Sequence, residues 1–451
     1  MKKLLSFLLI LMMLSTLTAC NTSKAEEATS QTEKSEATIE TTTETTTASV
    51  AKTEDILTSP VAIEYWYCFT DTVEKYNLDK VDEFNNTVGK DLGITVNAVN
   101  QQDYTTVAQK LQASAVAGST PAVVLMGVDQ TPFVKDDVLL SLDAYIQRDG
   151  IEPSDFYDGF LEQSYYNNKL YSMPFLKSTA VIIYNKTMFD KANLDATKMI
   201  TWDDFATYAA TLHEKLGVYG TTTYSWPWIL ESYLFSYNSS LRNSDNTTTI
   251  NSDLTKDFAK MFLSLKQSGV AHLIPQAEYN NIYSEFASGK TAMIPMSTGA
   301  IISLAGLGAK YGMEVGVAFM PKGDIDATIT GGGNLAITTK ISDAEKEAAW
   351  QFVKFMTNAD NSVAASVATG YLPTRKSVKS DATLKAFLEK VPQMQVAINQ
   401  LENAKNPSNT GNEENRAIST VIENIWISNT DLDTTLQEAE TKINIILNEE
   451  N

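Results

Sequence analysis

The stretch "VAIEYWYCFTDTVEKYNLDKVDEFNNTVGKDLGITVNAVN" (residues 61–100) decides the fold class. Its first nine residues are an apolar run typical of a buried strand, residues 71–88 have the apolar period of an amphipathic helix, and residues 93–100 again indicate a strand. Short apolar strands between helices predict a parallel or mixed sheet that is covered on both faces. We therefore expect an α/β fold, with any ligand at the carboxyl ends of the strands.

The same alternation continues along the chain, and no internal repeat interrupts it. Further strands are predicted at residues 121–127, 180–185, 313–321 and 333–338, and further helices at residues 104–118, 202–216, 255–269 and 344–357. Thr201 is expected to be the N-cap of the helix that follows it, because a threonine oxygen can accept a hydrogen bond from the first turn. The C-terminal third is predicted to be mostly helical.

The chain begins with Lys2, Lys3 and an uncharged apolar run, the layout of a secretory signal peptide over residues 1–20. The last four of these residues, "LTAC", resemble the lipobox of bacterial lipoproteins, in which the cysteine is acylated and becomes the new N-terminus. We therefore expect Cys20 to carry a lipid anchor. The alternatives are a plain cleavage site with a chance cysteine and a membrane-spanning helix.

Residues 21–58 are mostly Thr, Ser, Glu and Ala and are predicted to form a disordered tether, because they contain too few apolar side chains to offset the entropy of ordering. The other cysteine, Cys68, then has no partner for a disulfide. About 390 residues remain, enough for two lobes. The net charge of −20 makes nucleic acid and anionic lipid headgroups poor partners.

Catalytic motifs are missing from the sequence. The chain has two histidines, His213 in a predicted helix and His272 near a predicted helix end, and neither belongs to a metal-ligand spacing, so we expect no metal and no cofactor. There is no G-x-S-x-G elbow, and "SGKTAM" (residues 288–293) lacks the first glycine of a phosphate-binding loop. Glycosidase chemistry by a pair of carboxylates stays open.

Four landmarks, in order, carry a resemblance that extends over residues 60–451. They are "LYSMPFLKSTAVIIYNKTMFDKANLD…ITWDDFATYAATLHEK" (170–215), "FASGKTAMIPMSTGA" (286–300), "GVAFMPKG…TGGGNLAIT" (316–338) and "TGYLPTRK" (369–376). This pattern resembles the extracellular solute-binding proteins of family 1, which deliver sugars and related polyols to ABC importers. Asn193 stands where the family usually has glycine. Within the family, the pattern resembles the glycerol-3-phosphate and glycerophosphodiester binding proteins and their oligosaccharide-binding relatives.

The resemblance implies the two-lobe, type II fold of periplasmic binding proteins, with a hinged cleft between the lobes. Lobe 1 would comprise residues 59–178 plus 313–356, and lobe 2 residues 179–312 plus 357–451. The chain would cross between them near residues 175–182, 308–316 and 355–360. Closure of the lobes on a ligand would be a hinge motion.

The resemblance also implies a set of ligand-binding residues, most of them at the predicted crossings and strand ends. They are Tyr104, Asp129 (with Val128 as the alternative match), Ser178, Trp226, Trp228, Thr298, Gly299, Gly332, Tyr371 and Arg416. The tryptophans would stack on a sugar ring or a glycerol backbone, and Arg416 would bind a phosphate. The three glycines 331–333 allow a close backbone approach, either to a ligand or to a tight strand entry.

These expectations define a membrane-tethered receptor that captures a carbohydrate and delivers it to an ABC permease. An alternative has the same role with sn-glycerol 3-phosphate or a glycerophosphodiester, and two further alternatives are an extracellular carbohydrate-active enzyme and a surface adhesin. The receptor would act as a monomer on the outer face of the bacterial cytoplasmic membrane. A neutral sugar is favoured, because Glu413 and Glu414 beside Arg416 would weaken an anion site.

Overall fold

Ten of the strands form one mixed sheet in the computed structural model, which describes residues 50–127, 129–408 and 412–449. The strand order is β2-β1-β3-β11-β6-β9-β7-β8, with β10 beside β6 and β12 beside β11. The strands of this sheet are β1 (Val61–Tyr67), β2 (Ile94–Asn100), β3 (Val123–Met126), β6 (Ser172–Asn185), β7 (Tyr219–Tyr224), β8 (Ala271–Ile274), β9 (Thr291–Ser297), β10 (Val315–Ala318), β11 (Thr328–Ile337) and β12 (Ala404–Lys405). A separate hairpin pairs β4 (Tyr165–Tyr166) with β5 (Lys169–Leu170).

Helices cover this sheet along most of the chain. The α-helices up to residue 236 are α1 (Thr53–Ile56), α2 (Asp71–Asn86), α3 (Val88–Leu92), α4 (Tyr104–Ala117), α5 (Thr131–Lys135), α6 (Asp143–Asp149), α7 (Asp158–Leu161), α8 (Lys186–Ala192), α9 (Trp202–Leu216) and α10 (Pro227–Ser236). The remaining ones are α11 (Asp253–Gln267), α12 (Asn281–Ala287), α13 (Ile301–Lys310), α14 (Asp343–Met356), α15 (Ala359–Thr369), α16 (Ala382–Lys390), α17 (Gln393–Asn399), α18 (Asn412–Trp426) and α19 (Leu432–Glu449). The short 3₁₀ helix η2 (Glu162–Ser164) matters for the site below.

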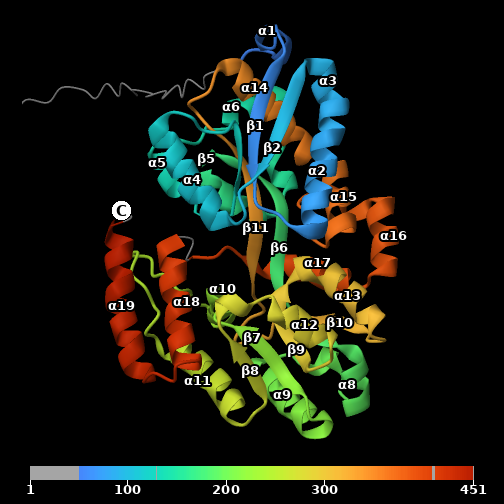
Figure 1. Ribbon diagram of the computed structural model, residues 1–451, viewed down its shortest axis with the longest axis vertical. Coiled ribbons are helices and arrows are strands. Elements are labelled where there is room, and N and C mark those ends of the chain that lie inside the picture. Colours follow the sequence, from blue (N-terminus) through green and yellow to red (C-terminus); the bar gives the residue numbers. More distant parts are fainter. Residues whose placement is uncertain (1–49, 128, 409–411, 450–451) are drawn as a thin grey trace, which may run out of the picture. The chain divides into compact units, whose positions relative to one another are not determined.

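Two long strands, β6 and β11, join two groups of parallel strands. One group is β1, β2 and β3, and the other is β7, β8 and β9. Strand β6 pairs with β11 through residues 172–179 and with β9 through residues 180–184, so it belongs to both groups (Figure 1). The sheet is therefore mixed, as the alternation of apolar strands and helices predicted.

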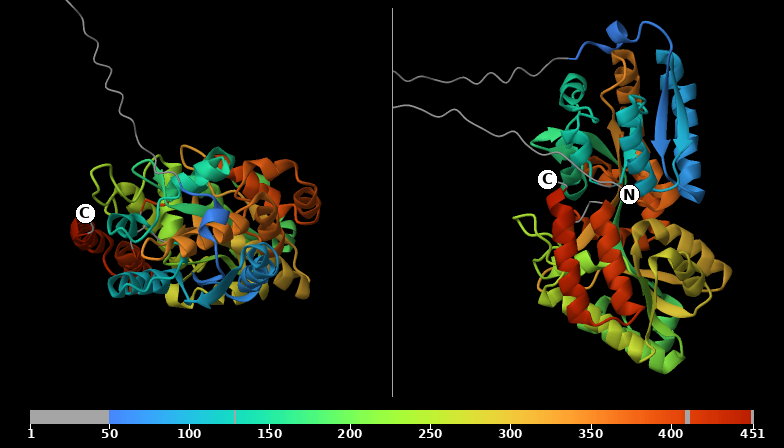
Figure 2. Two further views of the ribbon diagram at one scale, coloured as in Figure 1. Left: turned by 90° about the horizontal axis from the view of Figure 1, so that it is seen from above. Right: turned by 60° about the vertical axis from the view of Figure 1, so that its left-hand side comes forward.

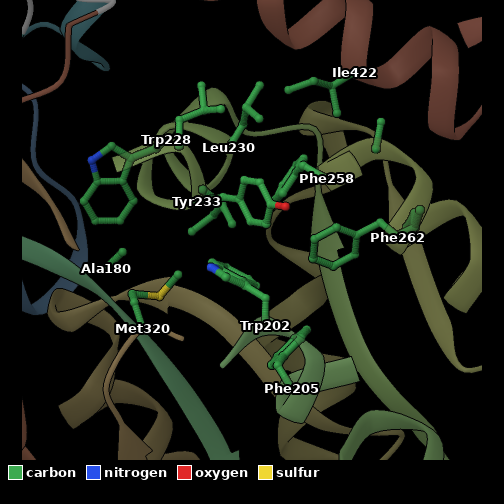
Figure 3. Close-up of a cluster of buried hydrophobic side chains, with 14 of the residues drawn as sticks. Ala180, Trp202, Phe205, Trp228, Leu230, Tyr233, Phe258, Phe262, Met320 and Ile422 are labelled. Carbon is green, nitrogen blue, oxygen red and sulfur yellow. The ribbon is translucent and has the colours of Figure 1, made fainter. Parts of the chain in front are cut away.

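Separate hydrophobic clusters stabilise the two groups. One cluster contains Tyr65, Phe84, Trp350 and Phe352, where α2 and α14 cover β1 and β2. A second cluster centres on Trp202 and also includes buried side chains of α10, α11, α18 and α19. Figure 3 shows this second cluster, with Trp228 at its margin. Helices α18 and α19 lie side by side in both orientations shown (Figures 1 and 2).

The segment that begins at Val50 is fixed to the group of β1. Arg148 Nη1 donates to the backbone oxygen of Ala51 and to Glu347 Oε2, at 2.9 and 2.7 Å. The hydroxyl of Thr53 in α1 donates to Glu347 Oε1 at 2.7 Å. Glu347 is fully buried, and its charge is compensated by Arg148. Because a buried carboxylate needs such partners, this pair holds the segment tightly. The prediction of a disordered tether over residues 21–58 was therefore wrong for its described end, which contains helix α1, while residues 21–49 lie outside the described residues.

Several local predictions can be compared with these elements. Thr201 is the N-cap of α9, and its hydroxyl and the Asp204 side chain form a capping box. His213 lies in α9 as predicted, and His272 lies shortly after the end of α11, in strand β8, where its ring stacks on Tyr219. Cys68 is a free thiol. None of the described helices has the length and apolarity needed to cross a membrane, and Cys20 lies outside the described residues.

Candidate functional site

A cavity of about 320 Å³ lies where the carboxyl ends of strands from both parallel groups meet. Met126 is the last residue of β3, Ser297 is the last residue of β9, and Trp226 follows the end of β7 by two residues. The lining residues are Tyr104, Met126, Gly127, Gln130, Gln163, Ser178, Trp226, Trp228, Ser297, Thr330, Gly331, Gly332, Asn334, Tyr371, Pro407 and Asn415. None of these residues is Asp, Glu, Lys, Arg or His, so the described lining is polar but uncharged. Its volume lies at the lower end of the range of small-molecule sites.

The glycine run of β11 brings its backbone unusually close to its neighbours. Gly332 has a φ of +89°, and a Cβ on it would lie 2.0 Å from the carbonyl oxygen of Leu176. A Cβ on Gly331 would lie 2.9 Å from the ring of Trp228 and 3.1 Å from the hydroxyl of Ser178. Glycine is therefore required at Gly332 by both conformation and space, and at Gly331 because an indole packs on the backbone.

Three aromatic rings form a cluster at one wall. Tyr224 and Trp226 stack with their centroids 5.1 Å apart and their planes 13° apart, and Trp226 and Trp228 are 4.4 Å apart. The indole nitrogen of Trp228 donates to the carbonyl oxygen of Thr330 at 2.7 Å. This buried hydrogen bond fixes the Trp228 ring against β11, and the rings of Trp226 and Trp228 form an apolar part of the cavity wall.

Three lining side chains have a buried polar atom with no hydrogen-bond partner among the described residues. These atoms are the hydroxyl oxygen of Tyr104, Nε2 of Gln130 and Oδ1 of Asn334. The Tyr104 ring packs where a Cβ on Gly127 would lie, and burial raises the pKa of its hydroxyl well above the ordinary value. Because an unpaired buried polar atom costs about 1–3 kcal/mol, three in one cavity favour a polar ligand.

A fully buried lysine stands behind the cavity. Lys177 in β6 donates from Nζ to Oε1 of Gln163 at 3.1 Å, and Nζ also lies 5.8 Å from the centroid of the Phe160 ring. Among the described residues it forms no ion pair. Desolvation lowers the pKa of Lys177 to about 7. The Lys177 contact occupies the oxygen of Gln163 and leaves the amide nitrogen of this lining residue for a ligand.

A second cavity, of about 410 Å³, adjoins the first. We call the first the inner cavity and the second the outer cavity. Gln130, Gln163 and Pro407 line both cavities. The outer cavity also includes charged side chains, namely Asp129, Glu162 and Lys405, together with the rings of Tyr165 and Phe235. The inner cavity is therefore uncharged in its described lining, while the outer one is amphipathic.

The structure brings six of the sequence-predicted site residues together in the inner cavity. These are Tyr104, Ser178, Trp226, Trp228, Gly332 and Tyr371. They come from α4, β6, α10, β11 and the loops next to β7 and α15, which are far apart in the sequence. Their convergence is a geometric finding, and their contact with a ligand stays a prediction.

The other four predicted residues lie elsewhere. Asp129 lines the outer cavity, where its Oδ1 accepts from the backbone nitrogen of Thr131 at 2.9 Å. Thr298 is buried and accepts from the backbone nitrogen of Thr179 at 3.2 Å. Gly299 packs next to the Tyr371 ring. Arg416 is exposed on α18. Cys20 and the alternative Val128 lie outside the described residues.

Sequence reasoning missed several lining residues, and most of them are neighbours of predicted ones. Gln130 follows Asp129, Ser297 precedes Thr298, and Asn415 precedes Arg416. Thr330, Gly331 and Asn334 belong to the same glycine run as Gly332, so that run was the available signal. The other missed residues are Met126, Gly127, Gln163 and Pro407.

Sequence comparison finds several similar proteins. Residues 79–394 match the profile of a family described as bacterial extracellular solute-binding protein. A putative binding protein of Brucella abortus is 25% identical over 369 residues, which cover 79% of this chain and 86% of that protein. The sn-glycerol-3-phosphate-binding periplasmic protein UgpB of Escherichia coli is 28% identical over 249 residues, covering 52% of this chain and 56% of UgpB.

Solved structures give a consistent result for the fold. UgpB from Mycobacterium tuberculosis, in complex with glycerophosphocholine, is 26% identical with a TM-score of 0.77, covering 86% of this chain and 99% of its own. The GacH receptor of Streptomyces glaucescens, studied unliganded and with acarbose, is 22% identical with a TM-score of 0.74, covering 86% of this chain and 98% of its own. At this lower identity the second likeness concerns the fold alone.

Proposed function

This chain belongs to the bacterial extracellular solute-binding proteins and has their two-lobe type II fold, and we propose that its inner cavity captures a neutral carbohydrate for an ABC importer. The observation that carries this proposal is the described lining of the cavity, which combines an aromatic wall with polar but uncharged groups. Aromatic faces stack on the C–H faces of sugar rings, and amides and hydroxyls pair with sugar hydroxyls.

A second candidate has the same role with a glycerophosphodiester as its ligand. It is favoured by the similarity to UgpB of Mycobacterium tuberculosis, whose structure contains glycerophosphocholine, and by the rings of Trp226 and Trp228, which would suit a quaternary ammonium group. A phosphate group, however, would find no cation among the described lining residues, and Arg416 is exposed on α18 outside that lining. The neutral carbohydrate is therefore the preferred ligand.

Strand β6 contains the first crossing of the chain between the two proposed lobes. Lobe 1 would comprise residues 59–178 plus 313–356 and lobe 2 residues 179–312 plus 357–451, so the chain would first cross between Ser178 and Thr179. Along β6, Thr179 still pairs with β11, whereas Ala180 pairs with the last residue of β9, so the pairing partner changes one residue later, between Thr179 and Ala180. Hinge closure around this crossing would trap the sugar, and the permease would recognise the closed form.

The proposed location is the outer face of the bacterial cytoplasmic membrane, as a lipid-anchored monomer. The support is the family, which is extracellular, and the "LTAC" motif that ends at Cys20. The part of the predicted tether before Val50 would let the receptor reach the permease while the anchor keeps it at the membrane.

The receptor is proposed to release its ligand unchanged. The family and the solved relatives are binding proteins. Among the described residues no group of three or more His, Cys, Asp or Glu side chains could hold a metal ion. The competing function is that of a carbohydrate-active enzyme, which would release a chemically changed sugar.

The test is calorimetric titration of the whole chain with maltose, maltotriose, sn-glycerol 3-phosphate and glycerophosphocholine, together with chromatography of the sugars afterwards. We expect binding of a sugar with a dissociation constant near micromolar, which corresponds to about 8 kcal/mol, and recovery of intact sugar. Exclusive binding of the two phosphates would favour the second candidate, and cleaved sugar would refute the receptor role.

A further inference from the structure

Ser172, the first residue of β6, links two amide side chains of the inner cavity. Its hydroxyl donates to Oε1 of Gln130 at 2.9 Å, and its oxygen accepts from Nδ2 of Asn334 at 3.2 Å. Ser172 is fully buried, Asn334 is 4% exposed and Gln130 is 5% exposed. Water therefore does not compete for these bonds, and the serine hydroxyl is a shared partner that holds both amides.

A serine hydroxyl has a single proton, and this fact sets the orientation of both amides. Because the proton is given to Gln130, the oxygen of Ser172 can only accept from Asn334. The Nδ2 group of Asn334 also donates to the hydroxyl of Ser164 at 3.1 Å, which satisfies its second proton. The atoms left over are one donor, Nε2 of Gln130, and one acceptor, Oδ1 of Asn334.

The strands keep this arrangement rigid. In the register of β6 and β11, Ser172 faces Ala336 and Pro174 faces Asn334, and the register shifts between Gly333 and Asn334. On its other side Asn334 pairs with Met126 of β3. Asn334 thus stands at a β-bulge in the interior of the sheet, a feature that aims a side chain away from the regular alternation.

We propose, on the basis of the proposed function, that Ser172 is a positioning residue that makes this cavity select a hydroxyl group over a phosphate oxygen. A hydroxyl can accept from Gln130 and donate to Asn334 through one oxygen. A phosphate oxygen without a proton accepts only, so it would leave Oδ1 of Asn334 unpaired and repel it. The ligand class is therefore a neutral polyol, with the Tyr104 hydroxyl as a third polar contact.

The experiment measures the affinity of Ser172→Ala for maltotriose and for sn-glycerol 3-phosphate by calorimetry. Without the shared hydroxyl, Asn334 can turn its Nδ2 group toward the cavity. We expect the affinity for maltotriose to fall about 10-fold or more while the affinity for sn-glycerol 3-phosphate rises. The ratio of the two affinities therefore becomes smaller. A general packing defect would instead lower the affinity for both ligands.

Two further variants make the result specific. Ser172→Thr keeps the hydroxyl and should restore the selectivity. Ser164→Ala is the matched control, because it removes a buried serine that contacts Asn334 but leaves the bond between Ser172 and Gln130 intact. It should keep most of the selectivity.

Equal losses for both ligands in Ser172→Ala, or unchanged selectivity, would overturn the role of Ser172 while leaving the receptor function in place. If the wild-type chain instead cleaved maltotriose slowly, the receptor function would fail, but the ratio of the two affinities would still test Ser172. A wild-type preference for sn-glycerol 3-phosphate over maltotriose would overturn the selection rule.

Discussion

The buried amine of Lys177 has neither solvent nor, among the described residues, a paired carboxylate to compensate its positive charge. The side chain is fully buried, and the pKa of Lys177 is lowered by desolvation to about 7. The carboxylates on the adjoining segments have other partners: Asp158 pairs with Lys376 and Glu162 accepts from Asn406. Because the charge of Lys177 is compensated so little, its burial lowers the stability of the fold. We infer that the role of Lys177 is to orient Gln163.

The variant Lys177→Met tests this interpretation through the pH dependence of stability. Below pH 7 the wild-type lysine is charged in both states, so the full penalty of burying the charge is present. Between pH 7 and 10.5 only the unfolded state keeps the proton, and wild-type stability rises with pH by up to about 1.4 kcal/mol per unit. The stability advantage of Lys177→Met should therefore shrink by about 2–3 kcal/mol between pH 7 and 9.

Urea unfolding at several pH values measures this difference. Lys191→Met is the control, because it makes the same replacement at a position that is exposed on α8. A constant difference between Lys177→Met and the wild type across this range would contradict the assignment of a buried, destabilised charge.

Strand β11 depends on a glycine that no other residue can replace. Gly332→Ala would introduce strain at a φ of +89° and a contact of 2.0 Å with the carbonyl oxygen of Leu176. We expect a loss of at least about 2 kcal/mol in the free energy of unfolding, together with weaker sugar binding. Gly306→Ala in α13 is the matched control, because its added Cβ meets nothing within 4 Å and alanine favours a helix. Equal stability of the two variants would contradict the close approach of Gly332 to the carbonyl oxygen of Leu176.

The elements show which parts of the fold a sequence can predict. The period of apolar residues predicted the parallel strands β1, β2 and β3 and the intervening helices, since this signal is local. It predicted only the second half of β6, and the first half contains Pro174, which has no backbone N–H to donate to a neighbouring strand. The structure accommodates Pro174 opposite the β-bulge at Asn334, where the regular pairing is already broken.

The site was predicted less completely, for a geometric reason. On a helix one residue changes the direction of a side chain by about 100°, so Arg416 is exposed on α18 whereas Asn415 lines the cavity. Gln163 lies in the short helix η2, which has no periodic pattern, and reaches the site through its contact with Lys177. Such a position depends on long-range packing and leaves no local signal.

The molecule as a whole is proposed to act while attached to a membrane. Cys20→Ala should release the chain from the membrane fraction into the medium, because the lipid would be its one covalent link to the bilayer. Fractionation followed by immunoblotting measures this, and calorimetry should find an unchanged affinity for sugar. The reason for that expectation is that Cys20 is far from the lining residues in the sequence and that the chain is held to the body by its own contacts from Ala51 and Thr53 onward. Retention of the variant in the membrane would contradict the lipid anchor.

The aromatic wall gives the protein an optical property as well as an apolar surface. The chain has six tryptophans, and Trp226 and Trp228 are the two that line the cavity. Trp202, Trp350 and Trp426 are fully enclosed in the cores, where a ligand in the cavity would not reach them. A bound sugar would displace water beside Trp226 and Trp228 and alter their emission, while the enclosed indoles provide a steady background. The chain thus carries its own fluorescent reporter, and ligand libraries can be surveyed without a label.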